Sequence, residues 1–438
     1  IKIKIMKPKS NIFLKRKILI YGLGKSGLSA FRFLNNKSEV FLFDDFKSQI
    51  KKKYIKKKII SYEDTINSNF DKIIISPGID IDRCKLSNFL KKNYDKIYSD
   101  LDVFYAFFKN DCITITGTNG KSTTCQLLYE VLIHQKFDTR LVGNIGNSIL
   151  SVKNVEKKTI FVIEASSYQL EYSKIFKSKY SVILNLSPDH IERHKTIKKY
   201  VKAKFKLLQN QNKGHIAFVK KDDKLISKEL KSNKFNIKII KVNTKKNDSI
   251  LKIIDNDYFL LETNKENLSF ILEISKRLNL KKTSLVKTIQ NFKGLKYRQQ
   301  IIFKNNFLTI INDSKSTSLA SSIGALKTKS KIFWLLGGIH KKRDQFKLPK
   351  KYFKNISAYI YGKSKPFFIK KLKGKIKYKN FDSLKEALKE VLVVVKKNKL
   401  ISKTILFSPS AASFDSFNNF EDRGYYFNKL IKKYLNGK

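Results

Sequence analysis

The stretch 113–124, ITITGTNGKSTT, places Lys121 and Ser122 directly after a glycine, where a strand-like run passes into a helix-forming one. A lysine at this point can contact the β- and γ-phosphates of a nucleotide, a serine can ligate Mg²⁺, and the turn amides can bind the anion. A full Walker A loop would begin at position 115, which is Ile115, and the nearest glycine is Gly117. An ordinary turn is the alternative, but the strand–turn–helix context favours a nucleotide site with a shortened loop.

A second glycine-rich turn, YGLGKSGLS, contains Gly22, Gly24 and Gly27 after another strand-like run, and Asp44 and Asp45 end the next strand. This G-x-G-x-x-G pattern with a following acid is a dinucleotide fingerprint, so an NAD-dependent dehydrogenase is one alternative. Such turns also bind mononucleotides and sugar nucleotides, and a simple dehydrogenase does not need a second, separate phosphate loop. The pattern therefore indicates a nucleotide-type ligand and leaves its kind open.

A carboxylate and an imidazole follow two later strand-like runs. Glu164, in FVIEASSYQLE, ends one strand, where its carboxylate can hold the Mg²⁺ that Ser122 contacts. The next run ends in LNLSPDHIERH, which brings Asp189, His190 and His194 into one loop. We expect His190 in the site, because it directly follows a strand end and an acid, and His194 on the surface. The serine pair after Glu164 has no evident base partner, which gives a serine hydrolase little support.

Small polar residues follow three strand-like runs in the last third of the chain: NDSKSTS at 312–318, GGIHKKRD at 337–344 and SPSAASFDSFNNFEDRG at 408–424. In an open α/β sheet, ligands bind at the carboxyl ends of the strands. Serine and asparagine also cap helices, which explains any one of these stretches without a ligand. The three together indicate a small, charged substrate in this part of the chain.

The elements that must position these residues alternate between strand-like and helix-like patterns from end to end, which predicts an α/β protein. Strands are expected within 16–24, 39–45, 71–80, 112–117, 159–167, 180–190, 308–314, 331–338, 357–362 and 404–410, and helices at 25–36 and 122–135. The chain of 438 residues is long enough for several cores. We expect three domains, 1–100, 101–295 and 296–438.

The charge balance is extreme, with 92 Lys and Arg against 36 Asp and Glu, a formal net charge of +56. A basic nucleic-acid-binding ATPase is therefore a further alternative. Lysines spread over the whole chain, however, and residues with AT-rich codons (Lys, Ile, Asn, Phe, Tyr) are abundant. We favour compositional drift, expect no specific nucleic-acid partner, and take the charge as a statement about solubility and nonspecific binding.

The chain shows neither a membrane-spanning nor a secretory pattern. No apolar run approaches the 18 or more residues that a membrane span needs, and the basic N-terminus lacks an uninterrupted apolar segment. Three scattered cysteines form neither a disulfide framework nor a metal-binding pair. These features favour a reduced, cytoplasmic setting. Met6 is the only methionine, so we expect translation to begin there.

The motifs, taken in order, resemble those of the Mur ligases of peptidoglycan synthesis. The matching stretches are GLGKSGLS, SPGI, GTNGKSTT, GNIG, EASSYQLE, LNLSPDHIERH, DSKSTS, LLGGIHK and SPSAASFDSFNNFEDRG, from about residue 17 to the C-terminus. The central motifs are also shared with folylpolyglutamate synthase, so a folylpolyglutamate synthase-like amide ligase and other Mur ligases are alternatives. SPGI and the last stretch point to the branch of the family that adds D-glutamate.

The resemblance implies a fold, a reaction and a site. The fold is a Rossmann-like N-terminal domain, a central P-loop ATPase-type parallel sheet and a C-terminal Rossmann-like α/β domain. The reaction is ATP-dependent ligation of D-glutamate to UDP-N-acetylmuramoyl-L-alanine through an acyl phosphate, with ATP and two Mg²⁺ ions as cofactors. Lys204, in YVKAKFKL, matches the lysine that the family carbamylates to make a metal ligand. We expect a monomer.

The implied contacts fall into five groups, with every residue numbered in this sequence. UDP-substrate contacts are implied at Lys25, Ser26, Asp44, Asp45, Gly78, Asn144 and His190. ATP contacts are implied at Gly117, Thr118, Asn119, Gly120, Lys121, Ser122, Thr123, Asn264, Asn267, Arg298, Asp313 and Lys315. D-Glutamate contacts are implied at Thr317, Lys341, Ser413 and Phe420. Metal ligation is implied at Ser122, Glu164, His190 and Lys204, and a catalytic role at Lys121, His190 and Lys204.

The chain departs from the family pattern at several of these positions. The histidine that usually precedes the N-x-x-N stretch is Thr263, and a usual H-R-x-E reads Tyr297, Arg298, Gln299, Gln300. Lys25 replaces a residue that is often apolar. These differences concern fine contacts and leave the expected reaction unchanged.

Overall fold

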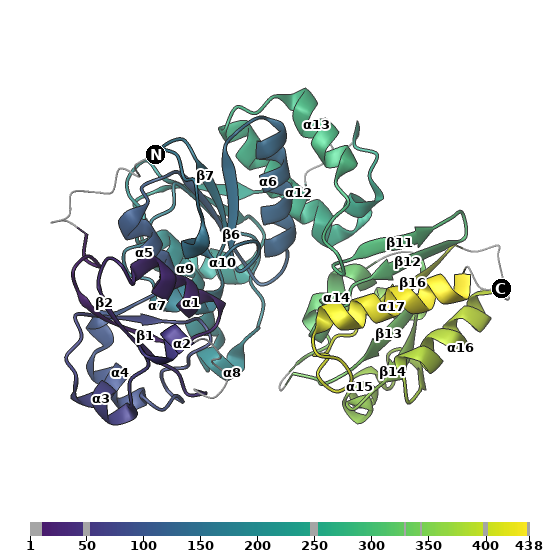
Figure 1. The fold of residues 1–438 in the computed structure, drawn as a ribbon. Helices are drawn as coiled ribbons and strands as arrows, with labels where there is room; N and C mark the ends of the chain where they lie inside the picture. Colours follow the sequence, from purple (N-terminus) through teal and green to yellow (C-terminus); the bar gives the residue numbers. More distant parts are fainter. Residues whose placement is uncertain are drawn as a thin grey trace. The chain divides into compact units, whose positions relative to one another are not determined.

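The computed structural model describes residues 11–46, 53–245, 253–327, 330–341, 344–396 and 402–435. Met6 lies outside these ranges. Two compact units can be distinguished, one formed by Ile1–Lys246 with Ser269–Leu285 and the other by Asn247–Leu268 with Val286–Lys438, and each is described by itself. Figure 1 shows the ribbon with its elements labelled.

The first sheet lies in the N-terminal part of the first unit and has four parallel strands in the order β2-β1-β3-β4. Its strands are β1 (Lys17–Tyr21), β2 (Glu39–Phe43), β3 (Lys72–Ile75) and β4 (Ile97–Tyr98). Its helices are α1 (Lys25–Leu34), α2 (Lys53–Lys56), α3 (Tyr62–Asn67), α4 (Ser87–Lys92) and the 3₁₀ turn η3 (Tyr94–Lys96). The nearly continuous apolar run of β1 is typical of a parallel strand that is covered on both faces.

The second sheet is six-stranded and parallel, with the order β10-β9-β8-β5-β7-β6. Its strands are β5 (Cys112–Thr116), β6 (Thr139–Gly143), β7 (Ile160–Glu164), β8 (Tyr180–Ile183), β9 (Ile216–Lys220) and β10 (Lys238–Val242). Its helices are α6 (Lys121–His134), η4 (Ile149–Ser151), α7 (Ser167–Tyr172), α8 (Ile191–His194), α9 (Ile197–Gln209) and α10 (Lys224–Ser232). The central strands β5, β7 and β8 end at the loops that carry the predicted nucleotide and metal residues.

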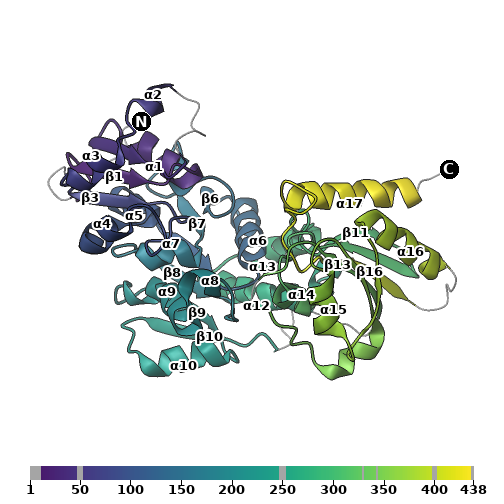
Figure 2. The ribbon, with the colours of Figure 1, turned by 90° about the horizontal axis from the view of Figure 1, so that it is seen from below.

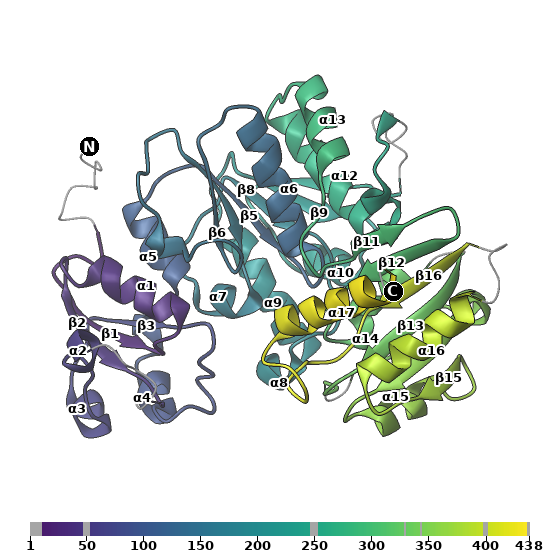
Figure 3. The same ribbon diagram turned by 45° about the vertical axis from the view of Figure 1, so that its right-hand side comes forward.

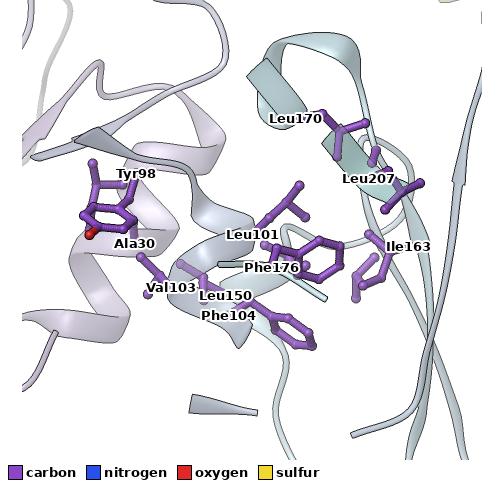
Figure 4. Close-up of a cluster of buried hydrophobic side chains, with 14 of the residues drawn as sticks. Ala30, Tyr98, Leu101, Val103, Phe104, Leu150, Ile163, Leu170, Phe176 and Leu207 are labelled. Carbon is purple, nitrogen blue, oxygen red and sulfur yellow. The ribbon is translucent and has the colours of Figure 1, made fainter. Parts of the chain in front are cut away.

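Helix α5 (Asp100–Phe107) joins the first sheet to the second, and it packs against α1, α7 and η4. Figure 4 shows part of the buried cluster around it, in which Leu101 and Phe104 of α5 lie among side chains from both sheets. The Asp102 carboxylate, fully buried, accepts hydrogen bonds from the Ser99 amide and from the three consecutive amides of residues 174–176, at 2.8–3.0 Å. One carboxylate thereby holds α5 against the segment that leads into β8.

The third sheet lies in the second unit and has the order β11-β12-β16-β13-β14-β15, parallel except for β11. Its strands are β11 (Gln300–Lys304), β12 (Leu308–Asn312), β13 (Lys331–Gly337), β14 (Ile356–Tyr361), β15 (Lys377–Asn380) and β16 (Lys403–Phe407). Its helices are α14 (Leu319–Leu326), η6 (Lys350–Asn355), α15 (Lys365–Leu372), α16 (Leu384–Lys396) and α17 (Phe420–Leu435). Helices α16 and α17 cover one face and α14 and α15 the other, as Figures 2 and 3 show.

Between the second and third sheets the chain forms η5 (Asp257–Leu260), α12 (Glu262–Arg277) and α13 (Lys282–Asn291).

The predicted α/β class is confirmed, and each expected strand and helix is present. The prediction omitted six strands: β4, β6, β9, β10, β11 and β15. Most of these are short, partly exposed or at a sheet edge, as β15 with its sequence KYKN is, so their apolar pattern is weak. The expected domain boundaries near residues 100 and 295 stay predictions.

Candidate active site

The predicted phosphate loop connects β5 to α6, as its sequence pattern indicates. Gly117 and Gly120 have φ values of +151° and +84°, a backbone conformation that L side chains rarely adopt. A side chain at Gly117 would also meet Leu184 Cβ at 3.1 Å. The loop therefore needs glycine at both positions, and α6 begins directly at Lys121.

Asn185, which follows β8, fixes the middle of this loop. Its Oδ1 accepts from the Asn119 amide at 2.9 Å, and its Nδ2 donates to the Asn119 carbonyl at 3.1 Å. Its own carbonyl accepts from the Thr118 amide at 2.8 Å. The Thr118 hydroxyl lies 2.9 Å from the Tyr200 hydroxyl and accepts from the Ser187 amide at 3.0 Å. The loop is thus held in shape by side chains and backbone from the segment after β8 and by Tyr200 of α9.

Two lysines converge on the same loop. The Lys121 ammonium donates to the Gly117 and Thr118 carbonyls, both at 2.8 Å. Lys204 of α9 is almost fully buried and donates to the Gly117 carbonyl at 2.9 Å. Burial, with a smaller contribution from Lys121, holds the pKa of Lys204 well below its ordinary value, while Asp189 and Glu164 act in the opposite direction. The Lys204 amine is therefore disposed to be neutral and nucleophilic.

Glu164 lies at the end of β7, next to the loop in the sheet, and is 1% exposed. Its Oε1 accepts from Asn144 Nδ2 at 3.1 Å. Its Oε2 is buried and has no hydrogen-bond partner among the described residues. A buried carboxylate oxygen without a partner is costly unless a cation or proton reaches it, so Glu164 fits the role of a metal ligand.

No three His, Cys, Asp or Glu side chains come together as a ready-made metal centre within the described ranges. Mg²⁺ is commonly held by one or two carboxylates together with substrate phosphates and water. Ser122, in the first turn of α6, is 3% exposed and belongs to the same loop. The donor set of hydroxyl and carboxylate oxygens is the one that this hard cation prefers.

His190 lies at the start of α8 with a left-handed φ of 53°. Its Nδ1 is 2.7 Å from the Tyr168 hydroxyl, and its Nε2 is 3.4 Å from Asp189 Oδ2. Glu192 Oε1 lies 3.4 Å from the same Nδ1. The ring is about one-third exposed and is surrounded by two carboxylates and a phenol, a setting that suits a proton-handling or metal-binding residue.

The prediction that His194 lies on the surface is wrong. Its side chain is buried, its Nε2 lies 3.0 Å from the Ser167 hydroxyl, and its ring packs between Tyr168 and Tyr200. Burial, reinforced by nearby Arg193, lowers the pKa of His194 to about 4. Ser167 therefore does have an imidazole partner, contrary to the sequence expectation. Both side chains are at most 3% exposed, so a substrate cannot reach the pair.

The glycine-rich turn after β1 forms the second predicted site. The Asp44 carboxylate accepts from the Leu23 amide at 2.6 Å, and Asp45 accepts from the Tyr21 hydroxyl at 2.8 Å, so both acids meet at this turn. A side chain on Gly27 would lie 1.9 Å from the Gly22 carbonyl, which explains why glycine is needed where α1 meets β1. Lys25 and Gly78 are exposed, and the Ser26 hydroxyl donates to Asp100.

In the second unit, Asp313 directly follows β12 and is 5% exposed. Its carboxylate accepts from the Gln299 amide at 3.1 Å and from the Ser408 hydroxyl at 2.8 Å. Ser408 in turn contacts Ser322, which lies 2.7 Å from Ser316. Burial raises the pKa of Asp313 to about 7, although these hydrogen bonds oppose the shift. The predicted polar stretches after β12 and β16 thus begin from a connected polar core.

The loops after β13 and β16 are joined directly. Ile339 and Ala412 exchange two backbone hydrogen bonds of 2.9 and 2.8 Å. Lys315 lies over the Phe420 ring, with its Nζ 3.9 Å from the ring centroid, so a predicted nucleotide residue contacts a predicted D-glutamate residue. Lys341 is partly exposed. The structure therefore gathers the expected amino-acid-binding stretches at the carboxyl ends of neighbouring strands.

Arg423, at the start of α17, was not singled out by the sequence analysis. It is 1% exposed and donates to the Ser314 carbonyl at 2.8 Å and to the Ala411 carbonyl at 3.0 Å. Gly338 leaves room for its Nη1, which would lie 3.2 Å from a Cβ there. One guanidinium thus links the loops after β12 and β16 and lies beside the loop after β13. The F-E-D-R-G stretch was part of a matched motif, but no local pattern distinguished its arginine.

The remaining predicted residues occupy varied environments. Asn264 and Asn267 are buried in α12, and Asn264 Nδ2 donates to the Tyr258 carbonyl at 2.9 Å. Arg298 and Thr317 are partly exposed, Ser413 is buried, and Thr123 is buried in the first turn of α6. Asn264, Asn267, Arg298, Asp313 and Lys315 belong to the second unit, and the phosphate loop to the first.

Two family models match this chain. The model described as "Mur ligase MurD-like, N-terminal domain" matches residues 16–97, and "Mur ligase middle domain" matches residues 115–285. The matched ranges contain the glycine-rich turn, the phosphate loop and the Glu164, His190 and Lys204 positions. The chain belongs to the Mur ligase family.

Curated relatives narrow the comparison to one kind of Mur ligase. A protein of Rickettsia felis is 33% identical over 97% of this chain and 98% of its own length, and one of Buchnera aphidicola subsp. Baizongia pistaciae is 34% identical over 97% and 99%. Both are named UDP-N-acetylmuramoylalanine--D-glutamate ligase. Among solved structures, MurF ligase of Thermotoga maritima in complex with ADP has a TM-score of 0.60 at 15% identity, covering 97% of each chain. That structural likeness supports the fold.

Proposed function

We propose that this protein is the ligase that joins D-glutamate to UDP-N-acetylmuramoyl-L-alanine at the expense of ATP. In this reaction a carboxylate oxygen of the L-alanine residue attacks the γ-phosphorus of ATP, and ADP leaves. The amine of D-glutamate then attacks the acyl carbon of the resulting acyl phosphate. The bond between that carbon and the phosphate oxygen breaks, and phosphate departs. The amine nitrogen loses its proton as the amide forms. The curated relatives, similar over nearly their full length, support this choice of substrates.

The arrangement of Lys121, Lys204 and Glu164 around the phosphate loop carries the proposal. A carboxylate and a triphosphate repel each other, so a site that joins them must supply fixed positive charge and oriented amides. Lys121 and the N-terminus of α6 provide both at the loop. Asn185 holds the loop amides in place before a nucleotide binds.

Magnesium fits the residues at this loop. Glu164, with its buried Oε2 and no partner for it among the described residues, and Ser122 would hold one ion, with His190 as a further ligand near the loop. A bound Mg²⁺ would neutralise phosphate charge during transfer. We expect a second Mg²⁺ ion, because the resemblance to the Mur ligases implies two.

Lys204 is the residue that we expect to carry a carbamate. Burial lowers the pKa of its amine and so favours the neutral form, which can form an N–C bond to CO₂ with loss of one proton. The product is an anionic oxygen ligand in place of an amine. Mass analysis of the intact protein under bicarbonate, with Lys204→Met as the comparison, would detect the modification independently of activity.

We assign D-glutamate to the loops of the second unit, where Thr317, Lys341, Ser413 and Phe420 are the expected contacts. A lysine and hydroxyl groups suit a dicarboxylate amino acid. The UDP part of the substrate is assigned to the turn after β1, with Lys25, Ser26, Asp44, Asp45 and Gly78, and Asn144 is assigned to its sugar-peptide part. A cytoplasmic location and a monomeric state stay predictions. None of the helices in the described ranges is long and apolar enough to cross a membrane.

ADP release by the purified full chain tests the proposal. It should require ATP, Mg²⁺, UDP-N-acetylmuramoyl-L-alanine and D-glutamate together, and a scan of amino acids should favour D-glutamate. ADP release stimulated by nucleic acid, or a bound nicotinamide, would instead support the two alternatives from the sequence. Lys121→Ala should abolish turnover while the chain stays folded, because the contact to the γ-phosphate is lost.

A further inference from the structure

Asp100 is a buried carboxyl group between the two predicted substrate regions of the first unit. It is the first residue of α5 and is 4% exposed. On one side its Oδ2 is hydrogen-bonded to the Ser26 hydroxyl of α1. On the other side Gln169 Nε2 of α7 lies 3.2 and 3.3 Å from its two oxygens. Asp100 thus links the helix that follows the glycine-rich turn to the helix that follows the metal-site strand β7.

The hydrogen bonds of Gln169 fix which way its amide faces. Its Oε1 accepts from the Ser166 amide at 3.1 Å, so its NH₂ group must point to Asp100. Gln169 is therefore a donor to Asp100, and it cannot turn round to accept a proton from it without losing that bond. In the hydrogen bond between Asp100 and Ser26, by contrast, either group can be the donor, depending on whether Asp100 is protonated.

Ser26 has one hydroxyl hydrogen and can donate it once. When Asp100 is ionised, that hydrogen goes to the carboxylate, and the Ser26 oxygen offers only lone pairs to a ligand at the N-terminus of α1. When Asp100 is protonated, its own O–H donates to Ser26, and the Ser26 hydrogen is available to a phosphate oxygen. The second arrangement suits an anionic ligand, and it also removes a buried negative charge next to that ligand.

The surroundings of Asp100 oppose its ionisation. Burial raises its pKa, while the hydrogen bonds from Ser26 and Gln169 act against the shift and Asp102 adds to it. The ionisable side chains on the elements packed against it are Lys25 and Arg32 on α1, Asp102 and Tyr105 on α5 itself, and Tyr168, Glu171 and Tyr172 on α7. Among these, Lys25 is exposed in the first turn of α1.

We propose that Asp100 is a positioning residue of the UDP-substrate site, and that its carboxyl group takes up a proton when the diphosphate of the substrate binds beside Ser26. Asp100 acts through Ser26 and does not touch the substrate. The inference rests on the proposed function in one respect, the assignment of the diphosphate to the N-terminus of α1. Because a proton then binds together with the UDP substrate, the affinity of the protein for that substrate must depend on pH.

Calorimetric titration of the full chain with UDP-N-acetylmuramoyl-L-alanine, without ATP, tests this inference. Titrations at one pH in buffers of different ionisation enthalpy give the number of protons taken up. In titrations between pH 5 and 9, the wild-type protein should take up protons wherever Asp100 is ionised in the unliganded state, and its Kd should rise with pH there by up to about tenfold per pH unit. A wild-type uptake of zero throughout would overturn the inference without any variant.

Two substitutions separate the positioning role from a structural one. In Asp100→Asn the amide NH₂ can donate to Ser26 at every pH, so we expect binding without this proton uptake and an affinity at pH 8 at least equal to that of the wild type. Asp71→Asn is the matched control, because Asp71 is an exposed acid of the same unit that accepts from the Lys17 amide at 2.8 Å. That variant should keep the wild-type proton uptake.

The outcomes distinguish the inference from the proposed function. Equal proton uptake in the wild type and in a folded Asp100→Asn variant would overturn the inference and leave the function standing. Failure of the wild type to bind the UDP substrate at any pH would contradict the proposed function, and the inference would fall with it.

Discussion

Replacement of Asn185 by alanine should weaken nucleotide binding without unfolding the protein. The change removes the two hydrogen bonds, 2.9 and 3.1 Å long, that fix Asn119 in the phosphate loop. It leaves the backbone bond from Thr118 to residue 185 in place. A neutral hydrogen bond contributes about 0.5–1.5 kcal/mol net, so the ordered loop should lose about 1–3 kcal/mol of free energy. If nucleotide binding requires the ordered loop, its Kd should rise about 5- to 150-fold.

The assay is calorimetric titration of the full chain with Mg–ADP, accompanied by thermal unfolding. Asn233→Ala is the matched control, because Asn233 Nδ2 also makes two hydrogen bonds, to the carbonyl and the side chain of Glu229 at the end of α10. It should lose similar stability and keep the wild-type Kd. A folded Asn185→Ala variant with wild-type affinity would refute the view that this side chain prepares the loop for phosphate.

Three further predictions concern buried ionisable groups. Lys204→Ala should lower turnover on the order of a hundredfold or more, with partial rescue by acetate or bicarbonate, and unchanged turnover would argue against its role. The pKa of Asp313, raised to about 7, means that stability falls as pH rises from about 4 to 7, so denaturant unfolding should find Asp313→Asn the more stable protein at pH 8. The pKa of His194, lowered to about 4, means that the stability of the protein falls as pH drops from 6.5 to 4. His194→Gln should flatten this pH dependence in denaturant unfolding, and an unchanged slope would contradict the prediction.

The features that could be predicted are those that depend on local pattern. Phosphate binding demands glycine, lysine and serine at fixed spacing before a helix, and the loop at 117–122 follows that rule. Glu164 was singled out because the last residue of a parallel strand lies at the ligand-binding edge of the sheet. The order of motifs then led to the family, which the comparisons confirm.

The features that were missed depend on long-range packing. Asn185 acts on a residue 66 positions earlier in the chain, and no local pattern announces such a pair. Lys204 could be singled out from 92 basic residues only through the family resemblance, and its burial was not foreseen. His194 was misplaced for the same reason, since its burial arises from aromatic rings of α7 and α9.

The hydrogen bonds of Asp102 limit how this enzyme can be divided or recombined. The carboxylate belongs to the connection between the first two sheets, yet it satisfies three consecutive amides within the second. A fragment or chimera cut after residue 102 would leave those amides without their acceptor, at a cost of about 1–3 kcal/mol for each one that stays buried. Exchange of the first sheet between Mur ligases should therefore succeed only when the junction falls before Ser99, so that α5 is inherited with the second sheet.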